Sequence, residues 1–131
     1  MKVLMINGSP RKEGNTSIAL QEMEKIFQAE GIEVETVSIG GKDIRGCIAC
    51  GQCHAKGKCV FDDLVNETAP KFAACDGLVV ASPVYYASAN GTLISFLDRL
   101  FYSTPFDKTS RAADRLLRKA RVPESGNGCA V

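Results

Sequence analysis

The alternation of strand and helix patterns constrains the fold of this chain more than any other feature of its sequence. Residues 2–7 form an apolar run, which is typical of a strand buried on both faces of a parallel sheet. Further strands are predicted over residues 33–39 and 77–82, with helices between and after them. The order βαβαβα requires a parallel sheet with crossover helices, so the predicted class is an α/β fold.

Two of the predicted helices carry an apolar face. In the helix over residues 16–30 this face comprises Ala19, Met23, Ile26 and Phe27, and Gly31 is predicted to end the helix. In the helix over about residues 92–102 the apolar stripe comprises Leu93, Phe96, Leu97, Leu100 and Phe101. We expect both faces to pack against the sheet.

The crossover between the second and third strands is predicted to hold two short helices. Asp62 and Asp63 stand at a helix start, where carboxylates interact favourably with the positive end of the helix dipole. Pro70 interrupts the pattern, and proline suits the first position of a helix. We therefore expect one helix before Pro70 and another that begins at it.

Composition indicates the general class of protein. The 131 residues suit one domain, and 45% apolar with 24% charged residues is the balance of a globular protein. A net charge of +1 argues against a polycation built to hold nucleic acid, and no apolar run reaches the roughly 20 residues that span a bilayer. The apolar run at the N-terminus is too short for a signal-peptide core, so we expect a cytoplasmic protein.

The loop over residues 8–15 has the chemistry of a phosphate site. In open α/β sheets, ligands bind beyond the carboxyl ends of the strands. Gly8 and Gly14 let backbone amides approach an anion, Arg11 offers a guanidinium, and the next helix adds free N–H groups. Hydroxyl groups come from Ser9, Thr16 and Ser17. An ordinary turn with a Ser/Thr helix cap accounts for this composition equally well.

The loop over residues 82–91 follows the third strand and contains two adjacent aromatic residues. Tyr85 and Tyr86 offer rings that could flank a flat heterocycle. The simpler alternative is that one tyrosine packs into the core and the other is half exposed. In the flavodoxin-type strand order 2-1-3-4-5 the first and third strands are neighbours, and FMN binds where their loops meet.

At these residues the sequence resembles a known family. The runs that carry the resemblance are Asn7-Gly8-Ser9-Pro10-Arg11, Gly14-Asn15-Thr16-Ser17, Ser82-Pro83-Val84-Tyr85-Tyr86 and Phe96-Leu97-Asp98-Arg99. Together they resemble the NADPH-dependent FMN reductases and related flavodoxin-like oxidoreductases over about residues 1–108. The resemblance implies a flavodoxin-like three-layer αβα sandwich around a parallel sheet, of which only three strands are clearly present. It also implies a homodimer or homotetramer.

The resemblance assigns roles to particular residues. It implies that the FMN phosphate is held by Ser9, Arg11, Asn15, Thr16 and Ser17. It implies that the isoalloxazine ring lies along Pro83, Val84, Tyr85 and Tyr86, with Asn90 and Gly91 near the ring or a subunit interface. No catalytic residue is assigned, because the flavin carries the chemistry of hydride transfer. We expect Asp98 and Arg99 to form a structural ion pair or a dimer contact.

Four of the six cysteines fall in the loop over residues 40–61, which is too irregular to predict as helix or strand. Their spacing is Cys47-x2-Cys50-x2-Cys53-x5-Cys59. Such a loop can wrap three thiolates around one corner of a cubane, and a fourth cysteine completes the set. The spacing resembles that of iron–sulfur flavoproteins, a branch of the same fold, and the resemblance implies a [4Fe–4S] cluster beside FMN.

Other interpretations of the cysteines stay open. Zn²⁺ could use the four thiolates, or three of them with His54, although His54 by itself suits a surface position. The cysteines could also be free thiols, including a redox pair, or small apolar side chains that fill a loop. Cys75 is expected to be a buried filler, and Cys129 has no assigned role.

The C-terminal part of the chain departs from the family pattern. No fourth strand is predicted after Tyr102, and residues 108–121 contain six basic residues and one acidic residue. We therefore divide the chain into an incomplete FMN-binding domain over residues 1–108 and an atypical basic tail over residues 109–131. The expectation is a truncated or frameshifted product of a longer reductase gene.

Three functional hypotheses follow. The first is an FMN-dependent oxidoreductase that passes electrons from NAD(P)H through FMN to a small acceptor or an electron carrier. The second is an iron–sulfur flavoprotein that takes electrons from a ferredoxin-type carrier. The third is a non-catalytic fragment with zinc on the cysteines and a basic tail that contacts nucleic acid, which the charge of the whole chain disfavours.

Overall fold

The computed structural model describes residues 1–104. The predicted basic tail over residues 109–131, and Cys129 within it, lie outside the described residues. Among the helices of residues 1–104, none is long and apolar enough to cross a membrane.

A three-stranded parallel sheet forms the centre of the fold. Its strands are β1 (Lys2–Asn7), β2 (Glu33–Ser38) and β3 (Gly77–Ala81), in the order β2-β1-β3. Val3 of β1 lies opposite Val34 on one side and Gly77 on the other. This order and direction confirm the predicted α/β class and bring the ends of β1 and β3 side by side.

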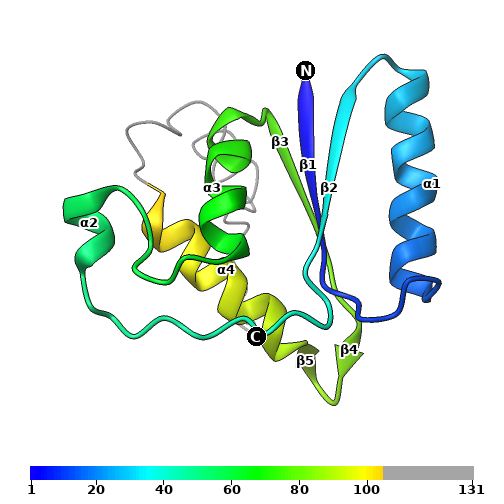
Figure 1. Cartoon of the computed structure of the whole chain (residues 1–131). Coiled ribbons are helices and arrows are strands. Elements are labelled where there is room, and N and C mark those ends of the chain that lie inside the picture. The colour runs from blue at the N-terminus through cyan, green and yellow to red at the C-terminus, as the bar shows by residue number, and fades with distance from the viewer. Residues whose placement is uncertain (105–131) are drawn as a thin grey trace, which may run out of the picture.

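Helices cover both faces of the sheet, which gives three layers (Figure 1). The helix α1 (Asn15–Ala29) lies on one face, and α3 (Leu64–Ala74) and α4 (Gly91–Ser103) lie on the other. The side chains of β1 lie alternately on the two faces of the sheet, since successive side chains of a strand point in opposite directions. Leu4 and Ile6 join the core beneath α3 and α4, and Val3 and Met5 join the core beneath α1.

The two cores differ in size. The core beneath α3 and α4 consists of Leu4, Ile6, Val37, Ile39, Val65, Phe72, Cys75, Leu93, Phe96 and Leu100. The core beneath α1 has three buried members, Val3, Met5 and Leu20. Within α4 the predicted stripe is confirmed at Leu93, Phe96 and Leu100, whereas Phe101 is exposed.

The predicted apolar face of α1 is confirmed at Phe27, which packs against the core beneath this helix, and is wrong at its other three residues. Ala19, Met23 and Ile26 are exposed, and the residues that face the sheet are Ser17 and Leu20, with Phe27 half buried. Ser17 is held by hydrogen bonds to the loop after β1, which sets the rotation of the helix about its axis. The side of α1 that faces the sheet therefore contains a buried polar residue, and Met23 and Ile26 lie on the exposed side.

The predicted break at Pro70 is also wrong, because α3 is one helix with Pro70 inside it. Proline removes one helical N–H bond, here the bond to the carbonyl of Asn66. Val65 and Phe72 are buried on either side of Pro70, and Asp63 caps the helix by accepting from the amide of Val65 at 3.0 Å. Anchors before and after the proline keep the helix continuous.

Two segments predicted as loops contain short regular elements. The cysteine-rich loop holds α2 (Gln52–Lys56), which lies between Gly51 and Gly57, both with positive φ. The loop after β3 forms a small antiparallel hairpin of β4 (Val84–Tyr85) and β5 (Ser88–Ala89). Neither element has the length at which a periodic pattern can be read from sequence.

The observed face of α1 predicts a contrast between two substitutions. Leu20→Ala removes a side chain that is 3% exposed and is expected to lower the free energy of unfolding by about 3 kcal/mol. Ile26→Ala, at a side chain that is 63% exposed, is expected to change it by less than about 0.5 kcal/mol. Urea unfolding followed by circular dichroism measures both, and equal losses would contradict the observed rotation of α1.

Candidate functional site

The loop between β1 and α1 is closed by its own hydrogen bonds. The side-chain oxygen of Asn7 accepts from the amide of Ser9 at 2.9 Å, and its side-chain nitrogen donates to the hydroxyl of Ser17 at 3.1 Å. The carbonyl of Arg11 accepts from both serine hydroxyls and from the amide of Gly14. These contacts tie the loop to the end of β1 and to the first turn of α1.

The N-terminus of α1 has no side-chain cap. Its N-cap residue is Gly14, so the first amides of the helix have no side-chain acceptor at that position. The interpretation of this loop as a turn with a Ser/Thr helix cap is therefore not what the structure shows. The helices α3 and α4, in contrast, are capped by Asp63 and Asn90.

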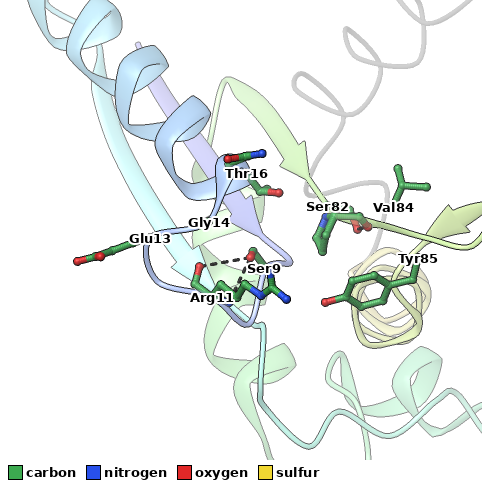
Figure 2. Close-up of a pocket in the computed structure, with 10 residues that line it drawn as sticks. Ser9, Arg11, Glu13, Gly14, Thr16, Ser82, Val84 and Tyr85 are labelled. Carbon is green, nitrogen blue, oxygen red and sulfur yellow. Dashed lines mark hydrogen bonds between the residues drawn. The ribbon is translucent and has the colours of Figure 1, made fainter.

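A cleft of about 770 Å³ opens between this loop and the segment that follows β3 (Figure 2). Its lining residues are Ser9, Arg11, Glu13, Gly14, Asn15, Thr16, Ser82, Pro83, Val84 and Tyr85. Figure 2 shows Arg11 and Tyr85 on opposite sides, with the hydroxyl end of the Tyr85 ring turned toward Arg11. The side chain of Glu13 points away from that gap.

The wall formed by the β4–β5 hairpin is held at its base. The hydroxyl of Ser82 accepts from the amide of Asn90 at 3.0 Å and donates to the carbonyl of Pro83 at 2.8 Å. Tyr86 stands at the turn with a φ of 59° and a fully exposed side chain. The two tyrosines thus differ, because Tyr85 lines the cleft and Tyr86 points into solvent.

Gly8 joins the two walls of the cleft. Its amide donates to the carbonyl of Ala81 at 2.8 Å, which ties the first loop to the end of β3. Its carbonyl accepts from the side-chain nitrogen of Asn90, and the side-chain oxygen of Asn90 accepts from the amide of Leu93 at 2.9 Å. One asparagine therefore links the first loop to the start of α4.

Seven of the predicted cofactor-binding residues line this cleft: Ser9, Arg11, Asn15, Thr16, Pro83, Val84 and Tyr85. The other four are placed elsewhere. Ser17 and Asn90 are buried and serve the loop contacts just described, Tyr86 is in solvent, and Gly91 is the exposed first residue of α4. The residues named from the resemblance therefore divide into a group that lines this cleft and a group that does not.

Sequence reasoning missed Gly40, which lies against the first loop. A Cβ atom at this position would stand 1.9 Å from the carbonyl oxygen of Ser9 and 2.3 Å from the nitrogen of Pro10. The adjacent pair Gly40 and Gly41 directly after the second predicted strand was the available signal. It marks a close approach of two backbone segments.

The four clustered cysteines line a second, smaller hollow beside the C-terminal part of α4. Their neighbours there are Ile48, Gly51, Val60, Phe61, Arg99, Tyr102 and Ser103. Cys53 is buried and its thiol contacts the carbonyl of Tyr102 at 3.8 Å, whereas Cys47 and Cys50 are exposed. His54 is exposed on α2, with its ring edge-on to Tyr102 at 4.9 Å.

Arg99 forms the buried floor of this hollow. Its guanidinium makes two hydrogen bonds to the carboxylate of Asp63, at 2.7 and 2.9 Å, and its Nε donates to the sulfur of Cys59 at 3.3 Å. Burial alone lowers the pKa of Arg99, but the bonds to Asp63 and Cys59 outweigh it and raise the pKa above its usual value. Arg99 therefore forms a structural ion pair with Asp63, whereas Asp98, expected to take part in such a pair or in a dimer contact, is exposed.

Cys75 takes no part in either site. It is 3% exposed at the end of α3, and burial raises the pKa of its thiol above the usual value. This position confirms the prediction of a buried filler.

The fold and the cleft define a flavodoxin-like α/β protein, and comparison with known proteins agrees. The profile of the family described as NADPH-dependent FMN reductase matches residues 1–120, and the chain belongs to this family. Crystal structures of the apo form of an NADH:FMN oxidoreductase (EmoB) share the fold, with a TM-score of 0.54 and 21% identity. That match covers 90% of this chain and 66% of the other.

Two curated relatives share more of the sequence. An iron–sulfur flavoprotein of Methanocaldococcus jannaschii is 40% identical over 99 residues, or 76% of this chain and 51% of that protein. An iron–sulfur flavoprotein of Archaeoglobus fulgidus is 42% identical over 100 residues, or 76% of this chain and 46% of that protein. The chain spans about half the length of these relatives.

The close approach at Gly40 predicts that the cleft depends on it. Gly40→Ala is expected to displace the first loop and to lower the free energy of unfolding by about 2 kcal/mol. Gly46→Ala is the matched control, because its Cβ would meet only the Ser95 hydroxyl at 3.8 Å and its φ is not positive. Urea unfolding measures stability, and amide chemical shifts of residues 8–15 report the loop. Unchanged shifts in Gly40→Ala would contradict the prediction.

Proposed function

We propose that this chain binds FMN in the cleft between the first loop and the β4–β5 hairpin and acts as a flavin-dependent redox protein. The observation that carries the proposal is the arrangement of the cleft. An uncapped helix N-terminus, a guanidinium and hydroxyl groups stand on one wall, and an aromatic ring stands on the other. This arrangement suits a ligand with a phosphate at one end and a flat ring at the other.

The phosphate end is assigned to the α1 side of the cleft. Free amides at the start of α1 and the positive end of its dipole favour an anion there. Arg11 supplies a full positive charge, and Ser9 and Thr16 supply hydroxyl donors. Ser17 is not included, because its hydroxyl already bonds Asn7 and the carbonyl of Arg11.

The ring end is assigned to the hairpin. Pro83, Val84 and Tyr85 line the cleft along this wall, and Tyr85 presents its ring to the gap (Figure 2). Bound FMN supplies the redox chemistry, since it accepts a hydride or single electrons. The residues of this chain bind and orient the ring and shield one side of it from water.

The electron donor in the first candidate function is NAD(P)H, and the acceptor is a small molecule or an electron carrier. Membership of a family described as NADPH-dependent FMN reductase supports this path. No side chain of the cleft is assigned as a nucleophile or proton donor, because the bound cofactors would supply the redox chemistry.

A second candidate function adds a [4Fe–4S] cluster held by Cys47, Cys50, Cys53 and Cys59, which would exchange single electrons with the flavin. The specific observation is that all four cysteines line one apolar hollow, as the curated relatives named iron–sulfur flavoproteins would lead one to expect. Thiolates in an apolar surrounding are the ligands such a cluster requires. This path leaves room for a ferredoxin-type carrier as partner.

The small volume of the hollow limits how a cluster could fit among the described residues. The hollow has a volume of about 20 Å³, so a cluster enters only when part of the loop moves outward. Cys47 and Cys50 are exposed, whereas Cys53 is buried. Within residues 1–104, no three His, Cys, Asp or Glu side chains converge on a position for a single metal ion.

The free cysteines and the exposed apolar side chains support proposals for the cellular location and the oligomeric state. We place the protein in the cytoplasm, because a cluster of free thiols persists in a reducing compartment. A homodimer or homotetramer is supported by apolar side chains left exposed on the hairpin, with Val84 73% exposed.

The assignment of the phosphate predicts a difference between two flavins. Arg11→Gln is expected to weaken FMN binding by about tenfold and to leave riboflavin binding unchanged, because only FMN carries the phosphate. Lys12→Gln is the matched control, since Lys12 is an exposed cation one residue along that lines a separate hollow beside β2. Fluorescence titration measures both flavins. Equal weakening of FMN and riboflavin by Arg11→Gln would contradict the assignment.

The two electron paths predict different spectra. Protein purified anaerobically is expected to show a flavin band that NADPH bleaches in the first candidate function. In the second, broad additional absorbance accompanies about four irons per chain, and Cys59→Ser loses the iron while FMN stays bound. Iron, zinc and flavin are counted on the same sample. A colourless chain that takes up neither added FMN nor iron would contradict both.

A further inference from the structure

Every N–H group of the Arg99 guanidinium donates a hydrogen bond within the protein. Arginine has five N–H groups, and each of them has an acceptor here. Two go to Asp63, one to the carbonyl of Arg45, one to the carbonyl of Phe61, and the Nε–H goes to the sulfur of Cys59. With Arg99 1% exposed, neither water nor another side chain competes for the Nε–H.

Cys59 is held by its backbone as well as by its sulfur. The side-chain oxygen of Asn66 accepts from the amide of Cys59 at 2.9 Å, and the side-chain nitrogen donates to the carbonyl of Cys59 at 3.0 Å. Asn66 lies on α3 and Arg99 on α4, so two helices of the main core fix this residue. Cys53 is also buried against α4, whereas Cys47 and Cys50 stay exposed.

We propose that Arg99 is the positioning residue of the cysteine site: it fixes the Cys59 sulfur and raises the reduction potential of the iron–sulfur cluster that the sulfur binds. The proposal rests on the second candidate function. An N–H bond to a ligand sulfur, together with a buried positive charge, stabilises the more negative, reduced form of a cluster. Asp63 offsets part of that charge, so the directional bond to sulfur carries much of the effect.

Lysine cannot take over this role. An ammonium group at position 99 keeps the charge beside Asp63, but it has three donors on one atom and no planar fork. It can reach the carboxylate or the sulfur, and it cannot satisfy the carboxylate, two carbonyls and the sulfur together. The role therefore depends on guanidinium geometry and not on charge alone.

The test compares two arginines of the holoprotein. Arg99→Lys keeps a cation for Asp63 and is expected to lower the equilibrium constant for cluster reduction by about tenfold, or about 59 mV for one electron. Arg45→Gln is the matched control: its guanidinium lies 5.1 Å from the Phe61 ring and that of Arg99 5.0 Å, but Arg45 is exposed and has no bond to a cysteine sulfur. Potentials come from a redox titration followed by electron paramagnetic resonance, and iron is counted on every sample.

A second measurement uses the unaltered protein and does not depend on whether a variant folds. With arginine labelled in ¹⁵N, electron–nuclear double resonance of the reduced cluster is expected to show a nitrogen coupling, because Nε lies 3.3 Å from a ligand sulfur. Arg45→Gln is expected to keep this coupling, and Arg99→Lys to lose it.

The outcomes separate the inference from the function on which it rests. A lowered potential in Arg99→Lys, an unchanged one in Arg45→Gln and an arginine coupling in the unaltered protein support the role of Arg99. Bound iron with an unchanged potential in Arg99→Lys, or without an arginine coupling, overturns the inference and leaves the cluster in place. An unaltered chain that takes up no iron overturns the second candidate function, and the inference with it.

Discussion

The architecture of the candidate flavin site depends on the backbone of Gly8. Its amide bonds the end of β3, and its carbonyl bonds the side chain that caps α4. Because β1 lies between β2 and β3, Gly8 leaves the sheet at the point where both walls of the cleft begin. A Cβ atom at this position would stand 3.1 Å from the Ala81 carbonyl, so the tight junction favours glycine. If this junction slipped, the first loop and the hairpin would separate.

The N-termini of the three longer helices differ, because two are capped by a side chain and one is not. Asp63 and Asn90 satisfy amides at the start of α3 and α4, and both also make a long-range contact, to Arg99 and to Gly8. The start of α1 has a glycine at the N-cap and opens into the cleft. A helix N-terminus without a side-chain cap has amides that can bind an anion. At a capped N-terminus these amides already have an acceptor within the fold.

The supports of both candidate sites depend on α4. Asn90 at its start bonds Gly8 and so holds the first loop beside the cleft, and Arg99 farther along the helix lines the cysteine hollow. Leu93, Phe96 and Leu100 fix the helix on the sheet between them. The packing of one helix therefore contributes to the position of both candidate sites.

Much of the fold and part of the site could be predicted from sequence. The apolar run of β1 and the order of the elements determined the parallel sheet, and the Gly, Ser and Arg residues of the first loop indicated an anion site. Sequence also placed four cysteines in one loop. It could not assign the buried face of α1, because Ser17 is turned inward by bonds to Asn7 and Arg11, which no periodicity encodes.

Only the tertiary structure decided which residues line the candidate sites and which residues hold that lining in place. Asp98 is next to Arg99 in sequence, yet the partner of Arg99 is Asp63, which is 36 residues away and reached through the packing of α3 on α4. Ser17 and Asn90 belong to the scaffold, and Gly40 supports the first loop from the end of β2. Local sequence determines strands, helices and loop chemistry because these depend on neighbouring residues. Hydrogen-bond partners depend on which distant segments the core brings together, and that is settled only when the chain is packed.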